Sequence, residues 1–304
     1  MVSDKSEQTL SEFKKLGGRL SLDVPMSRHT TMRVGGPAMA LYEPQSVNDL
    51  IEVLRLCRHG DVSMQVIGSG SNIIVDDAGT KKILVKLTSP FFKKAERSDT
   101  ELACGGGVLL NNLCAMAESS SLTGCEFLIG IPGTVGGAIF QNAGAYGRSM
   151  SDIIKYVKVI DSAGRQRVLD RKEAGFGYRS SRLKDFIIIG AAFCLQKSSM
   201  NYIKDKISRY MEERLMLQDY TAPSAGCIFK NPDNMDLSAG EMIDRCGLKG
   251  KRIGGAYVSG RHANFIVNKK SAKARDILQL IKLIKEKVNM RFDVVLEEEV
   301  EVIR

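Results

Sequence analysis

The chain has no tryptophan, few other aromatic residues and only three histidines, and each scarcity excludes some functions. Because aromatic residues make up only 6% of the 304 residues and no RNA-binding motif occurs, we expect no nucleic-acid partner. No histidine lies at ligand spacing from a cysteine, so we predict no metal site. The longest apolar run, residues 186–195, is too short to cross a bilayer. The polar start of the chain has no signal-peptide core, which predicts a cytoplasmic protein without a membrane partner.

The seven cysteines form no CxxC pair and lie mostly within apolar segments. An odd number of cysteines without an export signal predicts reduced thiols. We expect Cys57 and Cys114 to be small core residues on helices.

The net charge of +9 comes from lysines and arginines that are scattered along the chain. Such a balance suits an enzyme whose substrates are polyanions such as nucleotides. A non-catalytic protein that binds nucleotides or nucleic acid is the alternative from another functional class.

Glycine is concentrated in one stretch, residues 124–147, which holds seven of the 29 glycines and a single charged residue, Glu126. Glycine-rich backbone is costly to order, so it marks places of positive φ or of close approach to a flat or anionic group. Thr134 and the glycines around it could receive a pyrophosphate. On spacing alone, tight turns between buried strands explain this central glycine stretch slightly better.

A second glycine loop, Gly68-Ser-Gly-Ser-Asn72, directly follows an expected strand at residues 62–67. A Rossmann fingerprint would have a third glycine and a helix next, but residues 73–77 continue as β-structure. We therefore predict phosphate binding by a strand–loop–strand unit, with Ser69, Ser71 and Asn72 as side-chain donors.

The remaining periodicity predicts a mixture of helices and strands, which is the α+β class. We expect a first helix that ends at Gly17–Gly18, and a second that Ser46 caps and Gly60 closes. At residues 197–199 the sequence changes from an apolar strand to a charged amphipathic helix, which suggests a domain boundary there. The other expected elements are helices at 109–121, 201–218 and 272–289, a hairpin of residues 157–161 and 166–169, and strands at 186–195 and 294–303.

Five motifs, in this order, resemble the UDP-N-acetylenolpyruvoylglucosamine reductase (UDP-N-acetylmuramate dehydrogenase) family. They are GSGSN at 68–72, GIPGTVGGAIFQNAGAYG at 130–147, GYRSS at 177–181, SAGCIFKNP at 224–232 and Glu-Glu-Val at 298–300. The resemblance runs from about Thr30 to the C-terminus. Only one strand and one helix fit between Arg179 and Asp219, which indicates the compact (type II) form without the extra tyrosine-bearing loop.

The resemblance implies a vanillyl-alcohol-oxidase-like (PCMH-type) FAD-binding domain at residues 1–199, with lobes at about 1–88 and 89–199. A C-terminal α+β substrate-binding domain would follow at 200–304. It implies FAD held without a covalent bond and NADPH as hydride donor. We also expect a monomer. The implied reaction reduces UDP-N-acetylglucosamine enolpyruvate to UDP-N-acetylmuramate for peptidoglycan. Another FAD-dependent oxidase or dehydrogenase of the same fold is the alternative.

The resemblance also implies the residues of the site. Tyr178, Lys230 and Asn231 would bind the UDP-sugar substrate. The cofactor-binding residues would be Gly68, Ser69, Gly70, Ser71, Asn72, Gly133, Thr134, Gly136, Gly137, Ala138, Asn142 and Gly144.

Hydride addition to the enolpyruvyl methylene carbon needs a fixed cation, a proton donor and a polar group near the developing charge. The resemblance assigns these roles to Arg179, Cys227 and Glu299. A guanidinium stays charged and binds a carboxylate bidentately. A free thiol, with a pKa of about 8.5, is mostly protonated at neutral pH and can donate a proton.

Two assignments stay open. Strand alternation places Glu298, not Glu299, on the apolar face with Leu296 and Val300, whereas the family pattern selects Glu299. His262 is at least as well explained as a structural histidine as by ligand binding.

Overall fold

The computed structural model describes residues 4–233 and 235–304, and it has the expected α+β composition. The chain divides into two compact units. Unit 1 contains Met1–Leu22, Ala40–Ser69 and Lys82–Glu212, and unit 2 contains Asp23–Met39, Gly70–Lys81 and Glu213–Arg304. The domain boundary that we predicted between residues 199 and 200 stays a prediction. The compact units divide the chain between Glu212 and Glu213, within the helix Met200–Leu217.

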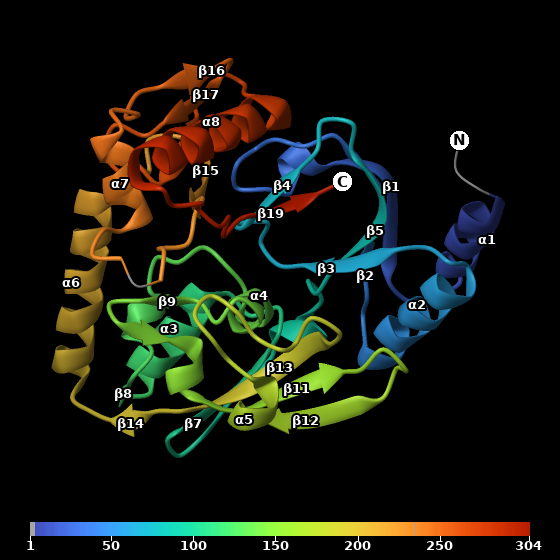
Figure 1. Cartoon of the computed structure of the whole chain (residues 1–304). Helices are drawn as coiled ribbons and strands as arrows, with labels where there is room; N and C mark the ends of the chain where they lie inside the picture. The colour runs from blue at the N-terminus through green and yellow to red at the C-terminus, as the bar shows by residue number, and fades with distance from the viewer. Residues whose placement is uncertain (1–3, 234) are drawn as a thin grey trace. The chain divides into compact units, whose positions relative to one another are not determined.

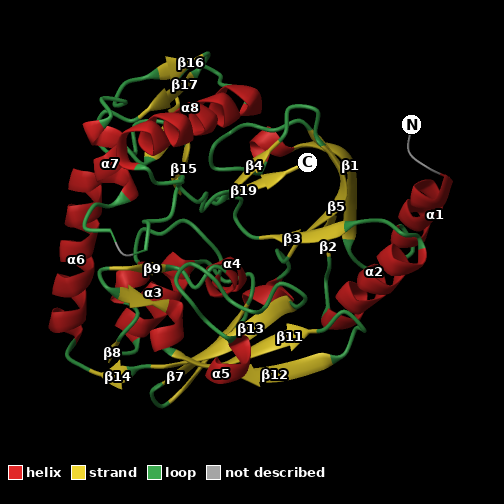
Figure 2. Ribbon diagram, in the orientation of Figure 1, coloured by secondary structure: helices red, strands yellow, loops and turns green. Residues whose placement is uncertain are grey.

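The elements are labelled in Figures 1 and 2. The helices are α1 Asp4–Phe13, α2 Val47–His59, α3 Leu110–Ser119, α4 Val135–Phe140, α5 Arg171–Ala174, α6 Met200–Leu217, α7 Ala239–Arg245 and α8 Ala274–Phe292. The strands up to the end of the central glycine stretch are β1 Arg19–Pro25, β2 Pro37–Glu43, β3 Met64–Ile67, β4 Ile73–Val75, β5 Thr80–Lys86, β6 Ala95–Ser98, β7 Glu101–Gly105, β8 Leu122–Thr123 and β9 Gly144–Ala145. Those that follow are β10 Arg148–Ser149, β11 Ile154–Ile160, β12 Gln166–Asp170, β13 Ile187–Cys194, β14 Gln196–Lys197, β15 Ser224–Cys227, β16 Arg252–Ile253, β17 Ala256–Val258, β18 Phe265–Asn268 and β19 Glu301–Ile303.

The central element of unit 1 is a five-stranded antiparallel sheet of order β12-β11-β13-β7-β6. Helix α4 packs on β13 and β7, and the apolar residues of this sheet and of α3 and α4 form one buried core. The predicted hairpin is confirmed as β11 and β12, with Ile160 opposite Gln166. A further sheet has the order β1-β2-β5-β3, and its parallel β3–β5 pairing places Ile67 opposite Lys86 within unit 1.

Unit 2 is built on an antiparallel sheet of order β15-β18-β17-β16, which α8 crosses (Figure 1). The buried face of α8 joins the core of this sheet through residues such as Ile277, Ile281 and Val288. Asp77 caps α8, because its carboxylate accepts hydrogen bonds from Ala274 N at 2.8 Å and Arg275 N at 3.0 Å. The segment that carries β4 is thereby fixed to the C-terminal part of the chain.

Most local predictions are confirmed. Ser46 caps α2, where its hydroxyl accepts from Asp49 N at 3.1 Å, and Gly60 follows the last turn. Cys57 on α2 and Cys114 on α3 are buried. The first helix ends at Phe13, four residues before Gly17, because the chain turns earlier to pack Phe13 against Tyr42 with ring centroids 5.1 Å apart.

The final strand is shorter than predicted. Only Glu301–Ile303 forms a strand, paired in parallel with β4, and the preceding residues make a single bridge, Glu298 opposite Phe229. Among the residues that the structure describes, no helix is long and apolar enough to span a membrane.

Candidate active site

The GSGSN loop, residues 68–72, packs tightly against the loop at residues 29–31. Gly70 has φ +71°, and a Cβ there would lie 1.9 Å from His29 O. Thr31 N donates to Gly70 O at 3.0 Å. Only glycine fits this position, because any other residue would combine a clash with a left-handed backbone. The division between the two units falls inside the loop, after Ser69.

The first residue of the GSGSN loop meets the central glycine stretch within unit 1. A Cβ on Gly68 would lie 2.7 Å from Thr134 Oγ1. Thr134 is the N-cap of α4, and its hydroxyl accepts from Gly137 N at 3.3 Å. Gly68 and Thr134, which lie 66 positions apart in the sequence, are therefore in close contact, and a side chain on Gly68 would clash with the Thr134 hydroxyl.

The amides at the start of α4 are largely used by the protein itself. Val135 N donates to Val108 O at 2.8 Å, and Gly136 N donates to Gly106 O at 2.9 Å. Gly137 N donates to the Thr134 hydroxyl, so all three amides have partners within the protein, and pyrophosphate binding by this stretch stays a prediction. The GSGSN loop keeps two serine hydroxyls, a donor set whose chemistry suits a pyrophosphate-bearing group such as FAD.

The GYRSS loop, residues 177–181, is bound to the central glycine stretch at every second residue. Ser181 Oγ donates to Phe140 O at 2.7 Å, and Asn142 Nδ2 donates to Gly177 O at 2.8 Å. Arg179 Nη2 donates to Gly144 O at 2.8 Å. These hydrogen bonds hold the GYRSS loop against the central glycine stretch.

Three of the ten described non-glycine residues with positive φ lie at this junction. Asn142 (φ 44°), Tyr146 (φ 55°) and Arg179 (φ 48°) all adopt the left-handed region that non-glycine residues rarely occupy. Such strain persists where the surrounding contacts over-determine it, and it is typical of functional sites. Arg179 is half-buried, whereas Tyr178 is 52% exposed.

Glu126 fixes the start of the central glycine stretch. Its buried carboxylate accepts from Gly124 N at 3.0 Å and pairs with Lys206 on α6 at 3.5 Å. Burial alone would raise the pKa of Glu126, but hydrogen bonds from Thr123 and the backbone, together with Lys206, lower it. The carboxylate is therefore held ionised as a structural anchor.

In unit 2, Cys227 ends the bulged strand β15. Ser224 lies opposite Val267 and Cys227 opposite Phe265, so the register shifts between them, at Gly226 with φ +74°. Bulges change the direction of side chains and often adjoin active sites. The bulge therefore sets the direction of the backbone at the half-buried Cys227.

Asn264 holds the residues after Cys227, and our sequence reasoning assigned it no role. Its buried side chain accepts from Phe229 N at 2.9 Å and donates to Phe229 O at 2.8 Å. Its backbone O accepts from Ile228 N at 2.9 Å. Asn264 lies two positions after His262, and no local pattern in the sequence points to its role.

His262 lies in the same turn and contacts Phe265, with ring centroids 4.7 Å apart. Its Nδ1 accepts from Asn264 N at 3.3 Å. Burial lowers the pKa of His262, which favours the neutral ring that this acceptor role needs. Of the two interpretations, these contacts favour a structural histidine.

The C-terminal segment lies beside the Cys227 strand. Glu299 N donates to Ile228 O at 2.8 Å, and Lys230 N donates to Glu297 O at 2.9 Å. This register sets Phe229 opposite Glu298 and Glu299 opposite Ile228, next to Cys227. The half-buried Glu299 is therefore hydrogen-bonded to the residue that follows the half-buried Cys227, although Cys227 and Glu299 lie 72 positions apart in the sequence.

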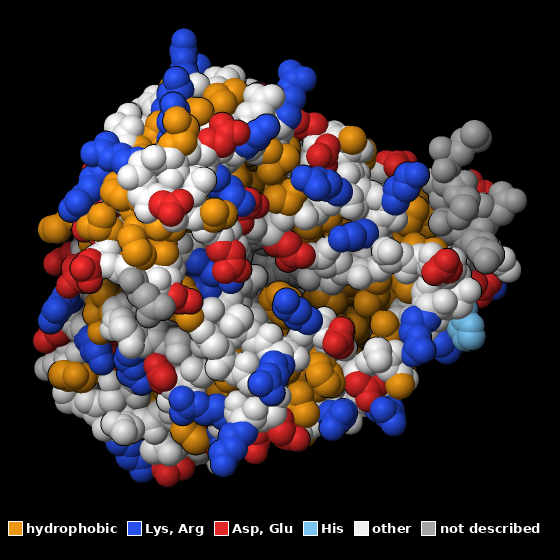
Figure 3. All heavy atoms as spheres, in the orientation of Figure 1, with side chains coloured by type: hydrophobic (Ala, Val, Ile, Leu, Met, Phe, Trp, Pro, Cys, Tyr) orange, Lys and Arg blue, Asp and Glu red, His pale blue; other side chains and the backbone are white. Residues whose placement is uncertain are grey.

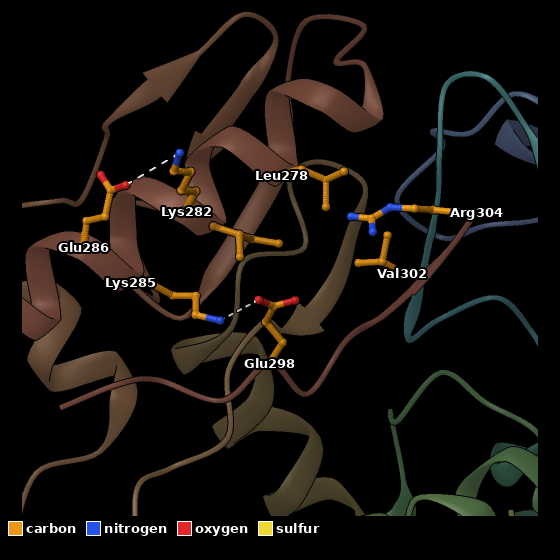
Figure 4. Close-up of a pocket in the computed structure, with 8 residues that line it drawn as sticks. Leu278, Lys282, Lys285, Glu286, Glu298, Val302 and Arg304 are labelled. Atoms are coloured by element: carbon orange, nitrogen blue, oxygen red, sulfur yellow. Dashed lines mark hydrogen bonds and ion pairs between the residues drawn. The ribbon is translucent and has the colours of Figure 1, made fainter.

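Glu298 has a different environment. Its Oε1 lies 2.9 Å from Lys285 Nζ on α8, at the edge of an open pocket that Leu278 and Val302 also line (Figure 4). The ion pair accounts for the carboxylate that strand alternation singled out. The assignment of the catalytic role to Glu299 and not to Glu298 stays a prediction.

Hydrogen bonds join the GSGSN loop to the C-terminal segment directly and to the Cys227 strand through Thr31. Asn72 Nδ2 donates to Glu299 O at 2.9 Å, and Glu301 N donates to Asn72 O at 3.0 Å. Thr31, which binds Gly70, also donates through Oγ1 to Ser224 O at 2.7 Å. Three motifs that lie far apart in the sequence thus converge within unit 2.

The two predicted substrate residues of unit 2 have protein partners. Lys230 forms an ion pair with Glu297, and Asn231 Oδ1 accepts from Ala239 N at the start of α7, at 3.1 Å. The predicted site residues therefore form two groups. Arg179, Tyr178 and the central glycine stretch belong to unit 1, and Cys227, Lys230, Asn231 and Glu299 belong to unit 2.

Comparison with known proteins identifies the family. Residues 38–170 match the model of an FAD binding domain, and residues 218–303 match that of the UDP-N-acetylenolpyruvoylglucosamine reductase C-terminal domain. The UDP-N-acetylenolpyruvoylglucosamine reductase of Carboxydothermus hydrogenoformans is 40% identical over 99% of both chains. That of Clostridium botulinum (strain Alaska E43 / Type E3) is 38% identical over 91% of both.

A solved structure agrees. The crystal structure of UDP-N-acetylenolpyruvylglucosamine reductase (MurB) from Thermus caldophilus superposes with a TM-score of 0.80 at 34% identity, covering 94% of this chain and 99% of that one. The resemblance and the α+β fold with an FAD-binding domain are confirmed. The chain belongs to the UDP-N-acetylenolpyruvoylglucosamine reductase family of flavin-dependent oxidoreductases.

Proposed function

We propose that the chain reduces UDP-N-acetylglucosamine enolpyruvate to UDP-N-acetylmuramate with NADPH and FAD, and that Arg179, Cys227 and Glu299 carry the chemistry. FAD, when bound, accepts a hydride from NADPH and supplies it to the enolpyruvyl methylene carbon. A proton on the neighbouring carbon completes the D-lactyl ether. One hydride and one proton thus add across the double bond, and NADPH becomes NADP⁺.

One observation supports this proposal above the others: in unit 2, Asn72 of the GSGSN loop is hydrogen-bonded to the Glu299 segment, and Thr31 links the loop to the Cys227 strand. The loop would hold the FAD phosphates through its backbone and through Ser69 and Ser71. A proton donor and a carboxylate beside such a loop suit a reduction that ends in protonation.

The roles follow from the chemistry of each group. The guanidinium of Arg179 would bind the carboxylate of the enolpyruvyl group and stabilise the charge that develops there. The Cys227 thiol would give the proton to the carbon next to that carboxylate. Glu299 would polarise or protonate the intermediate.

The remaining assignments are also part of the proposal. Tyr178, Lys230 and Asn231 would bind the UDP-sugar. Gly133, Thr134, Gly136, Gly137, Ala138, Asn142 and Gly144 would shape the flavin site, several of them by close packing and not by donating to phosphate. FAD would be held without a covalent bond.

We further propose a cytoplasmic monomer without nucleic-acid, membrane or metal partners. On the face that Figure 3 draws, lysine and arginine side chains are dispersed among acidic and apolar ones. Dispersed charge supports an enzyme over a protein that binds nucleic acid through a basic surface.

Product analysis tests the proposed reaction. The purified protein, supplied with NADPH and UDP-N-acetylglucosamine enolpyruvate, is expected to form a UDP-sugar that is heavier by two hydrogens. Removal of FAD should abolish the product, and addition of FAD should restore it. An unchanged substrate with FAD-loaded protein would contradict the proposal.

A further inference from the structure

We propose that Asn72 is the positioning residue of Glu299, and that its side-chain amide does not serve to bind the FAD phosphates. This inference rests on the proposed function, because it concerns the carboxylate to which we assign the chemistry. It also changes the expected role of Asn72, which the sequence alone counts among the cofactor-binding residues.

The peptide groups on both sides of the Glu299 Cα are fixed. The Glu299 N–H donates to Ile228 O at 2.8 Å, and the Glu299 carbonyl accepts from Asn72 Nδ2 at 2.9 Å. The first bond ties Glu299 to the Cys227 strand, and the second ties it to the GSGSN loop. Together they hold the backbone on either side of Glu299 and so restrict the direction of its side chain.

Asn72 also binds the start of β19. Its backbone O accepts from Glu301 N at 3.0 Å, where the parallel pairing of β4 with β19 begins with Ile73 opposite Glu301. Asn72 therefore contacts the chain before and after Val300, whose side chain is buried in the core of unit 2. Strand pairing and core packing fix residues 300–303, whereas the Glu299 carbonyl depends on the Asn72 amide.

The side-chain amide of Asn72 already donates to a carbonyl in this arrangement. The carbonyl of Glu299 would lose this hydrogen bond if the amide were removed, and the loss of a hydrogen bond to a partly buried carbonyl is unfavourable. Misplacement of a catalytic group by about 1 Å can slow a reaction by about 10²-fold. The loop proposed to hold FAD thus also sets the carboxylate that acts on the substrate.

A double-mutant cycle tests this inference. The variants are Asn72→Ala, Glu299→Gln and the combination, with Asn72→Asp as a second replacement that keeps the shape but cannot donate. Ser71→Ala, which removes a proposed donor to the FAD phosphates in the same loop, shows the effect of weaker FAD binding alone, and Glu298→Gln is the control for a neighbouring carboxylate. FAD affinity is measured by adding FAD to apoprotein, and the rates of flavin reduction by NADPH and of reoxidation by substrate are measured anaerobically at saturating FAD.

We expect Asn72→Ala and Asn72→Asp to slow reoxidation by substrate about 10- to 100-fold, while flavin reduction by NADPH stays within about twofold. The double variant should be no slower than Glu299→Gln, because Asn72 acts through Glu299. In the apoprotein, amide exchange of residues 297–301 should become faster in the Asn72 variants and stay unchanged in Ser71→Ala.

Multiplicative effects in the double variant would overturn the inference, as would Asn72 variants that lose FAD affinity but keep the rate of reoxidation. Full activity of Glu299→Gln would have a different meaning. It would contradict the assignment of Glu299 in the proposed function, and greater loss in Glu298→Gln would move that assignment to Glu298.

Discussion

Replacement of Cys227 by alanine is expected to slow reoxidation of the reduced flavin by substrate about 10²- to 10⁴-fold, the usual contribution of a general acid. Reduction of the flavin by NADPH should stay within about twofold, because hydride transfer from NADPH needs no proton from this thiol. Anaerobic stopped-flow measurement of the two half-reactions separates these effects.

Two further variants make the Cys227 experiment specific. Cys227→Ser should restore part of the lost rate, because a hydroxyl is also a proton donor. Cys194→Ala removes an exposed cysteine in β13 and should behave as the unaltered protein. Normal reoxidation by substrate in Cys227→Ala would remove the thiol from the mechanism.

Replacement of Arg179 by glutamine is expected to lower kcat/KM about 10²- to 10³-fold, in the range measured when one donor to a developing charge is removed. The guanidinium is the only group in our account that offers a fixed cation to the enolpyruvyl carboxylate. Arg179→Lys should recover little of the loss, because an ammonium group cannot bind a carboxylate bidentately. Steady-state kinetics with the UDP-sugar substrate measures both variants.

The matched control is Arg182→Gln, an exposed arginine three residues further along. It loses the same charge and should keep kcat/KM within about twofold. Because Arg179 also donates to Gly144 O, FAD content must be compared first, so that a disturbed central glycine stretch is not mistaken for lost catalysis. Equal losses in the Arg179 and Arg182 variants would contradict a specific role for Arg179.

Local signals in the sequence predicted much of the fold. The cap at Ser46, the hairpin of β11 and β12 and the amphipathic helix α8 each depend on residues close in sequence, and each is confirmed. Helix α4 was missed, because two of its six residues are glycines and its first amides are satisfied by Gly106 and Val108. Those partners lie about 27 to 30 residues upstream, where no local pattern points to them.

The alternation of apolar and polar residues predicted a strand at 294–303, but only Glu301–Ile303 forms one. Residues 294–300 alternate only in part: Leu296 and Val300 are buried, but Val295 is 73% exposed and Glu298 reaches Lys285. The segment bonds to Phe229 through one bridge and to Asn72 through a side chain, so it never becomes a regular strand. The hydrogen bond of Asn72 to Glu299 joins residues 227 positions apart, so no periodic pattern in the sequence could predict it.

The family motifs supplied what periodicity could not. They selected Arg179, Cys227 and Glu299, and in unit 2 the Glu299 N–H donates to the carbonyl of Ile228, the residue after Cys227. The supporting residues Thr31 and Asn264 escaped notice, because their hydrogen bonds join segments that the sequence does not relate.

Anaerobic reoxidation of the NADPH-reduced protein tests the central claim most directly. The protein, loaded with FAD and reduced with one equivalent of NADPH, is mixed either with UDP-N-acetylglucosamine enolpyruvate or with aerated buffer. Our account predicts rapid reoxidation by the UDP-sugar and slow reoxidation by oxygen. Rapid reoxidation in air with no response to the UDP-sugar would contradict it and would instead identify an oxidase built on the same fold.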